Sequence, residues 1–339
     1  MSRRLPIELI TLFYFLSYLP NIIMTKLVTT APNAGLGRPP TGLETLPASL
    51  IVSLVLTYAF IFVSGWHRDA HQTRLAGLRL PIFTRSTFLS GIGTALVLFT
   101  VPLSFTFEGV SIPFIQLLMR GDILIIAPLV DLIFGRRVRW WSWIALLMVA
   151  ASLAFVVQQR GGFNLPPLAI LTVLLYTLGY FIRLAVMTST AKSGDPALVR
   201  RYFVEEKLVA LPLSVAALAL LSWSGVGAQS GQLSWGFIAV WGDPVVWWLI
   251  GIGTTLTIIS IFAAVILLDA RENSYCVPLE RASSLLAGIG AAYLLAWFWG
   301  LRAPTAAETI GAAILVGAIV LLSVAPRFAR AKVEARAET

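Results

Sequence analysis

Charged residues are scarce in this 339-residue chain: Lys, Arg, Asp and Glu together make up only 12% of it. A soluble domain usually carries about twice that share. Hydrophobic residues make up 58% of the chain, and its mean hydropathy is +0.86. The composition therefore excludes a water-soluble globular domain and predicts an integral membrane protein.

Cysteine and histidine are nearly absent. The single cysteine, Cys276, allows no intramolecular disulfide and no metal site built from cysteine thiolates. The two histidines, His67 and His71, lie in one polar loop, where we expect solvated side chains. The sequence thus predicts neither a metal centre nor another cofactor.

Long apolar stretches dominate what is present, and a helix needs about 20 such residues to cross a bilayer. Barrel strands are excluded because the stretches are too long and too uniformly apolar. The connections are too short for a soluble domain. We therefore expect an all-α polytopic membrane protein with ten transmembrane helices, at about 5–26, 46–65, 87–107, 109–134, 140–158, 166–190, 202–223, 245–268, 274–299 and 305–325.

The basic residues predict how the chain is oriented. There are 25 Lys and Arg against 16 Asp and Glu, giving a net charge of +9. If both ends are cytoplasmic, sixteen of the 25 fall in inside segments and four in outside segments, as expected for membrane proteins. The surplus is explained without a nucleic-acid partner. The other five lie within spans or at a border: Arg120, Arg183, Lys207, Arg271 and Arg281.

Three collinear blocks of the sequence resemble one another at nearly constant offsets of 160, 162 and 165 residues. They are 90–96 with 250–256, the Tyr-x-Leu-small-Tyr segments 14–18 with 176–180, and 113–137 with 278–302. Span n thus matches span n+5, and because five is odd the second copy enters the membrane from the opposite side. We expect two inverted halves, 1–160 and 161–339, an architecture typical of secondary transporters.

The short basic loop between the fourth and fifth spans, Gly135-Arg136-Arg137-Val138-Arg139, adds to this pattern. With ten helices, two inverted halves and both ends inside, the chain resembles the drug/metabolite transporter superfamily, especially its EamA-like members, from about residue 5 to 325. The resemblance implies that fold, a transport activity and a bacterial plasma (inner) membrane location. The family usually has an acidic residue near this loop, whereas this chain has Arg136. The Asn-Lys signature of nucleotide-sugar carriers is absent too, so the resemblance does not name the cargo.

Charges at bilayer depth are candidates for contact with a transported solute, because each costs at least about 2.5 kcal/mol to insert. Arg120 is the deepest, near the middle of the fourth span. Gln116 lies one helical turn before it and could share its ligand. Asp122, two residues away, is expected to face a different neighbour.

A second group of candidates comes from spans one, six and nine. Arg183, Glu280 and Arg281 lie within apolar helices, and we expect four tyrosines to flank a cavity with them: Tyr14, Tyr18, Tyr176 and Tyr180. Guanidinium groups suit two-point capture of a carboxylate or phosphate, which favours an anionic or zwitterionic metabolite. Alternatively, these arginines pair with Asp122, Glu205, Glu206 and Glu280 and only lock helices together.

Glu205, Glu206 and Lys207 form a run of charges in the seventh span. The two carboxylates are candidates for coupling transport to protons. The competing interpretation places them at the cytoplasmic end, within reach of water, because the span is expected to begin near Tyr202.

These patterns favour a secondary transporter working by alternating access. The first alternative is a flippase for lipids or lipid-linked sugars, and the second is a membrane assembly or receptor subunit whose outer loop 235–241 contacts a partner. An enzyme is not expected, because Asp122 and Asp131 lie at different depths and on different faces of one helix. The expected partners are a small-molecule or lipid substrate and membrane lipids, with the chain as a monomer or a homodimer.

Overall fold

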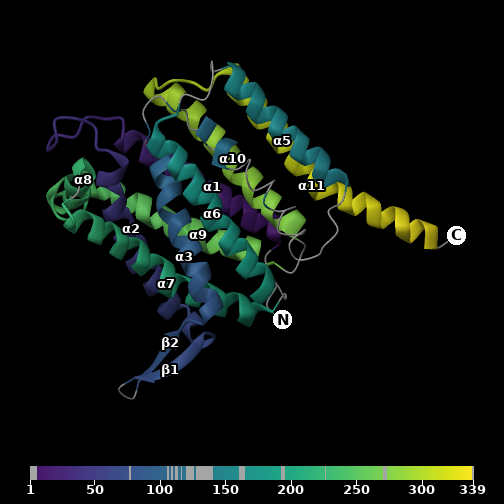
Figure 1. The fold of residues 1–339 in the computed structure, drawn as a ribbon, viewed down its shortest axis with the longest axis horizontal. Coiled ribbons are helices and arrows are strands. Elements are labelled where there is room, and N and C mark those ends of the chain that lie inside the picture. Colours follow the sequence, from purple (N-terminus) through teal and green to yellow (C-terminus); the bar gives the residue numbers. More distant parts are fainter. Residues whose placement is uncertain are drawn as a thin grey trace.

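A computed structural model describes residues 6–75, 78–104, 107, 110, 114–115, 117–119, 126, 140–159, 165–191, 195–225, 227–269 and 273–337. The fourth predicted span, 109–134, lies mostly outside these residues. Each of the other nine predicted spans coincides with a helix of at least 20 residues (Figure 1). These are α1 (Ile7–Val28), α2 (Gly42–Val63), α3 (Arg85–Ser104), α5 (Trp140–Gln159), α6 (Pro167–Thr190), α7 (Pro196–Trp223), α9 (Val246–Leu267), α10 (Asn273–Trp299) and α11 (Ala306–Ala337).

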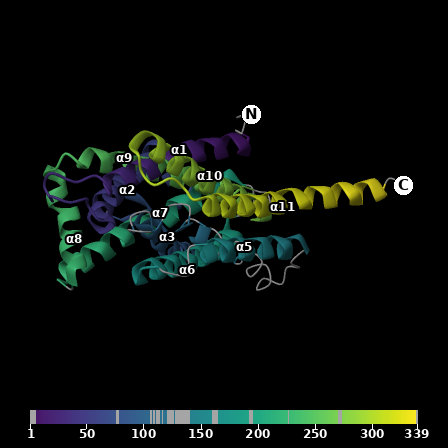
Figure 2. The ribbon, with the colours of Figure 1, turned by 90° about the horizontal axis from the view of Figure 1, so that it is seen from above.

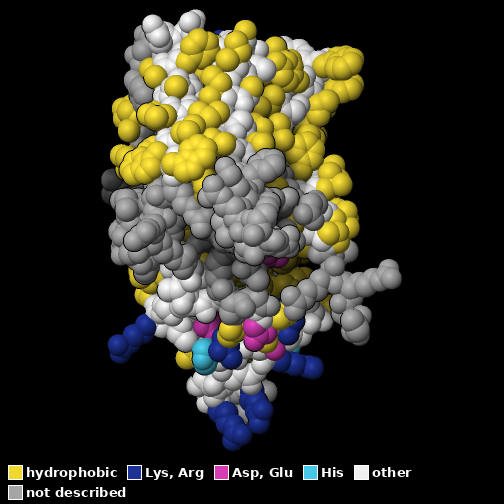
Figure 3. All heavy atoms as spheres, turned by 90° about the vertical axis from the view of Figure 1, so that its right-hand side faces the viewer, with side chains coloured by type: hydrophobic (Ala, Val, Ile, Leu, Met, Phe, Trp, Pro, Cys, Tyr) yellow, Lys and Arg dark blue, Asp and Glu magenta, His cyan; other side chains and the backbone are white. Residues whose placement is uncertain are grey.

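Five of the helices, α1, α2, α6, α9 and α10, are long and apolar enough to cross a membrane. Large apolar side chains also face outward along the bundle, among them Leu16, Leu147, Leu174 and Leu220, each more than half exposed. Figure 3 shows hydrophobic side chains over the upper body and charged ones gathered at the lower end. Such an apolar surface is costly in water, so the predicted helical membrane protein is confirmed at this level.

One connection forms strands, which the all-helical prediction did not include. Within 66–86, the short helix η1 (Trp66–Arg68) precedes the antiparallel strands β1 (His71–Leu75) and β2 (Leu78–Ile82). Residues 224–244 likewise contain α8 (Gly227–Phe237) and the short helix η2 (Ala239–Gly242). Hydrogen bonding explains the hairpin, because a polar segment leaving the helical bundle can satisfy its backbone groups by strand pairing.

Tertiary contacts attach the hairpin to the start of α7. The backbone N–H of His71 donates to Glu205 Oε1 over 3.1 Å, and His71 Nδ1 lies 2.6 Å from the same oxygen. Asp69, just before the hairpin, accepts from the Nε of Arg200 and, through its backbone carbonyl, from Arg201. His71 is therefore half exposed but bonded to a buried carboxylate, not simply solvated as expected.

Helices from the two parts of the chain interleave. α3 packs against α6 and α7, whereas α9 packs against α1 and α2, and α5 pairs with α11 at one side of the bundle (Figures 1 and 2). Glycine permits the close approach at two of these crossings. A Cβ added at Gly91 would lie 2.4 Å from Val209 Cβ and 3.3 Å from the Glu206 carbonyl oxygen. One added at Gly253 would lie 2.7 Å from Val52 Cβ and 2.6 Å from the Ser49 carbonyl oxygen.

Adding a methyl group at either crossing is expected to destabilise the fold. Gly91→Ala and Gly253→Ala should each cost about 1–3 kcal/mol through overpacking, seen as a lower melting temperature in detergent. The matched control is Gly231→Ala in α8, where nothing lies within 4 Å of the new Cβ and stability should not fall. Equal melting temperatures for all three variants would contradict this account of the crossings.

Candidate functional site

A cavity of about 70 Å³ lies among six helices of the bundle. One water needs roughly 10–15 Å³ of such space, so the cavity has room for a small solute. Its lining residues are Tyr14 and Tyr18 of α1, Thr94, Val97, Leu98 and Val101 of α3, Tyr180 and Arg183 of α6, Lys207 of α7, Leu256, Ile259, Ser260 and Ala263 of α9, and Glu280 and Arg281 of α10.

The α3 and α9 walls of the cavity match position by position. The lining positions are 94, 97, 98 and 101 in α3 and 256, 259, 260 and 263 in α9, and each pair differs by 162. Tyr18 and Tyr180, which line it from α1 and α6, differ by the same 162. This register differs by two residues from the 160 given by the glycine-rich segments. Two helices of like spacing thus present the same face to one cavity.

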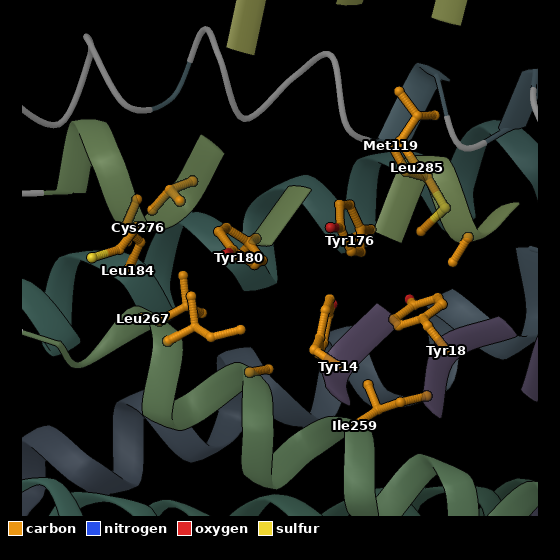
Figure 4. Packing of buried hydrophobic residues seen from close by; sticks show 14 of the residues in the cluster. Tyr14, Tyr18, Met119, Tyr176, Tyr180, Leu184, Ile259, Leu267, Cys276 and Leu285 are labelled. Carbon is orange, nitrogen blue, oxygen red and sulfur yellow. The ribbon is translucent and has the colours of Figure 1, made fainter. Parts of the chain in front are cut away.

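Three of the four predicted tyrosines, Tyr14, Tyr18 and Tyr180, line the cavity. Figure 4 shows Tyr14 and Tyr18 on α1 and Tyr176 and Tyr180 on α6, gathered in one cluster. The Tyr14 and Tyr18 rings are 5.3 Å apart, and the Tyr176 and Tyr180 rings are 5.9 Å apart. The fourth, Tyr176, instead accepts a hydrogen bond from Arg281. The predicted aromatic cavity is therefore present.

Arg281 is 2% exposed and held on three sides. Its Nε lies 3.0 Å from Glu280 Oε2, and its Nη1 donates to the Tyr176 hydroxyl over 2.5 Å. Its guanidinium carbon sits 3.8 Å from the centre of the Tyr180 ring, within cation–π range. The other Glu280 oxygen accepts from the Tyr14 hydroxyl. Arg281 Nη2 is buried with no hydrogen-bond acceptor among the described residues.

Glu206 is fully buried and gathers donors from three helices. Its Oε1 accepts from Arg183 Nε over 2.8 Å, and the side chains of α3 that reach the same oxygen are Ser90 and Thr94. Tyr202, one turn earlier on α7, donates to it over 3.2 Å. This ion pair fixes α6 and α7 against α3 at the edge of the cavity.

Lys207 lines the cavity and is 1% exposed. Its Nζ is 3.7 Å from Glu206 Oε2, close enough for ion pairing but too far for a hydrogen bond, and lies 5.6 Å from the centre of the Phe203 ring. The sequence pattern did not place Lys207 against a solute. The one available signal was a lysine followed directly by an apolar run in the seventh span.

The expectation that Glu205, Glu206 and Lys207 are within reach of water is wrong. α7 begins at Pro196 rather than near Tyr202, so all three lie deeper in the helix, and each is at most 1% exposed. Glu205 does not line the cavity. Its carboxylate accepts from Thr87 over 2.9 Å and contacts His71 of the hairpin.

The two interpretations of the buried arginines are compatible. Arg183 and Arg281 each pair with a carboxylate, Glu206 and Glu280, and each also lines the cavity. Three further candidates, Gln116, Arg120 and Asp122, lie outside the described residues. Within the described part of the chain, no group of three or more His, Cys, Asp or Glu is placed to hold a metal ion.

Comparison with known proteins gives a fold but no family. No protein-family model and no curated protein matches the sequence. A crystal structure of another protein matches 94% of this chain and 96% of its own length, with a TM-score of 0.52 and 17% sequence identity. At that identity the likeness shows a shared fold alone.

Proposed function

We propose that the chain is a secondary transporter that moves a small organic, anionic or zwitterionic metabolite by alternating access. In this proposal ten helices form a five-plus-five inverted repeat with both ends inside, and the chain is an EamA-like member of the drug/metabolite transporter superfamily in a bacterial inner membrane. The observation that carries it is the cavity itself, which is lined at matching positions by α3 and α9 and holds buried charges.

Helix packing supports the repeat. α3 contacts α6 and α7 as α9 contacts α1 and α2, which are the pairs expected if span n corresponds to span n+5. At one crossing in each half, a glycine faces a backbone carbonyl and the Cβ of a valine three residues further on. The pairs are Glu206 with Val209, and Ser49 with Val52. Two halves that rock against each other could expose the shared cavity to each side in turn.

Charge placement supports the proposed orientation and activity. The hairpin lies at the lower end of the molecule in Figure 1 and carries the exposed Arg74 and Arg79, and basic side chains gather at the same end in Figure 3. α1 begins and α11 ends toward one side in Figure 2. Buried charges in an apolar bundle are expensive and mark solute or ion pathways. Glu206 contacts cavity-lining residues and is the better coupling candidate, because Glu205 is bonded to the hairpin.

Filling the cavity tests this function. In proteoliposomes loaded with a mixture of amino acids, carboxylates and phosphorylated metabolites, the wild type should exchange at least one labelled solute saturably. Ser260→Phe, which fills the cavity, should reduce that exchange at least tenfold. The control is Ile258→Phe on the same helix, where the side chain is exposed on the outside of the bundle and exchange should persist.

Two results would overturn the proposal. Movement of a labelled phospholipid without exchange of any soluble solute would identify a flippase. Absence of both, together with equal behaviour of the two phenylalanine variants, would indicate a non-transport membrane subunit.

A further inference from the structure

The charged lining of the cavity comes from one part of the chain. Among the described residues, four charged side chains line it: Arg183, Lys207, Glu280 and Arg281. All belong to α6, α7 and α10. The helices α1 and α3 contribute tyrosines, a threonine and apolar side chains. A bound solute therefore meets a charged wall on one side only.

The described charges at this wall do not cancel. Glu280 pairs with Arg281, and Glu206, just behind the lining, pairs with Arg183. Lys207 is left as a second cation beside Glu206, at 3.7 Å from its other oxygen. Three cations against two carboxylates leave one positive charge. Burying an uncompensated charge is costly, so the wall favours a ligand that brings a single negative charge.

Hydrogen-bond donors are also left over. Lys207 has three N–H donors and no acceptor within hydrogen-bond distance among the described residues. Arg281 Nη2 is buried and likewise lacks an acceptor there. Both residues line the same cavity. A carboxylate supplies two acceptor oxygens and one negative charge, and so fits both the donors and the charge balance.

The facing wall sets what the rest of the ligand resembles. Its side chains are aliphatic at Val97, Leu98 and Val101 of α3 and at Leu256, Ile259 and Ala263 of α9. An apolar body placed there keeps its contacts, whereas a second charge would be desolvated without a partner. A zwitterion would also leave the extra positive charge of the wall uncompensated.

We infer that the cavity binds a small monocarboxylate, with its carboxylate at Lys207 and Arg281 and a short aliphatic body against α3 and α9. The inference rests on the proposed transport function and narrows its substrate class from anionic or zwitterionic to monoanionic. Lys207 is the residue that determines this preference.

Four probes of one carbon skeleton test the preference: 3-methylbutanoate, leucine, 3-methylbutylamine and methylsuccinate. In thermal unfolding of the purified full chain, 3-methylbutanoate should stabilise the wild type at the lowest concentration, because a ligand that binds the folded state raises its melting temperature. Stronger stabilisation by leucine, the amine or the dianion would overturn the inference. So would no shift with 3-methylbutanoate, and exchange of another solute in liposomes would then leave the transport function standing.

Lys207 variants separate binding from folding. Lys207→Met keeps the apolar stem and removes the surplus charge, so the ligand-free protein should melt no lower than the wild type, while affinity for 3-methylbutanoate falls at least tenfold. Lys207→Arg restores the charge and should recover the preference. A lower melting temperature for ligand-free Lys207→Met, or an unchanged preference, would show that Lys207 only supports Glu206 and would overturn the assignment.

Discussion

Arg281→Met is expected to be the most damaging single substitution in the cavity, lowering stability by about 3–5 kcal/mol and abolishing solute exchange. The variant leaves Glu280, 3% exposed, without its guanidinium partner. Breaking a buried ion pair from one side costs this much because an uncompensated charge stays behind. The substitution also removes the contact with the Tyr180 ring and the hydrogen bond to Tyr176.

A double variant separates the structural role of Arg281 from its role toward the solute. Glu280→Gln combined with Arg281→Met removes both charges while keeping similar volumes, and the introduced amide oxygen can still accept the hydrogen bond from the Tyr14 hydroxyl. We expect the double variant to melt well above Arg281→Met, with a coupling energy of about 1–3 kcal/mol. Exchange should remain absent, because the donor at the cavity wall is gone.

The measurements are thermal unfolding in detergent and solute exchange in proteoliposomes for the wild type, both single variants and the double variant. Recovery of exchange in the double variant would show that Arg281 serves the fold alone. Additive losses of stability would show that the 3.0 Å contact between Arg281 and Glu280 contributes nothing to the native state.

The helices could be predicted because their signal is local. An uninterrupted apolar run fixes both the helical conformation and its length, and nine predicted spans coincide with described helices. The hairpin could not be predicted in this way. Its strands are short and polar, and it is attached to α7 by Glu205, 134 residues after His71. Such a long-range contact leaves no periodic trace in either segment.

The candidate site was predictable in part for a similar reason. Arginine, glutamate and tyrosine stand out against apolar helices, and Arg183, Glu280, Arg281, Tyr14, Tyr18 and Tyr180 all line the cavity. The register was less accessible, because matching glycines align the sequence by identity at 160, whereas the lining faces of α3 and α9 align at 162. Lys207 was missed because two adjacent glutamates suggested a solvated helix end.

Glu206→Gln is expected to uncouple solute movement from a proton gradient. Glu206 is the shared acceptor of Arg183 and Tyr202 from α6 and α7 and of Ser90 and Thr94 from α3, and it is also the ion partner of Lys207. A carboxylate that loses a proton to hold two cations, and regains it when a solute anion takes one of them, links protonation to occupancy of the cavity. Glutamine keeps the shape but cannot exchange a proton.

The matched control is the adjacent carboxylate. Glu205→Gln removes a charge at the same depth of α7, but Glu205 bonds Thr87 and His71 rather than cavity-lining cations. With an imposed pH gradient, the wild type and Glu205→Gln should accumulate solute, whereas Glu206→Gln should only equilibrate it, a loss of at least tenfold in accumulation. Gradient-driven accumulation by Glu206→Gln would remove Glu206 as the coupling group. Loss of accumulation in Glu205→Gln alone would assign coupling to the contact between α7 and the hairpin. Because the two carboxylates are neighbours on one helix, any difference between these variants reflects which groups each one faces.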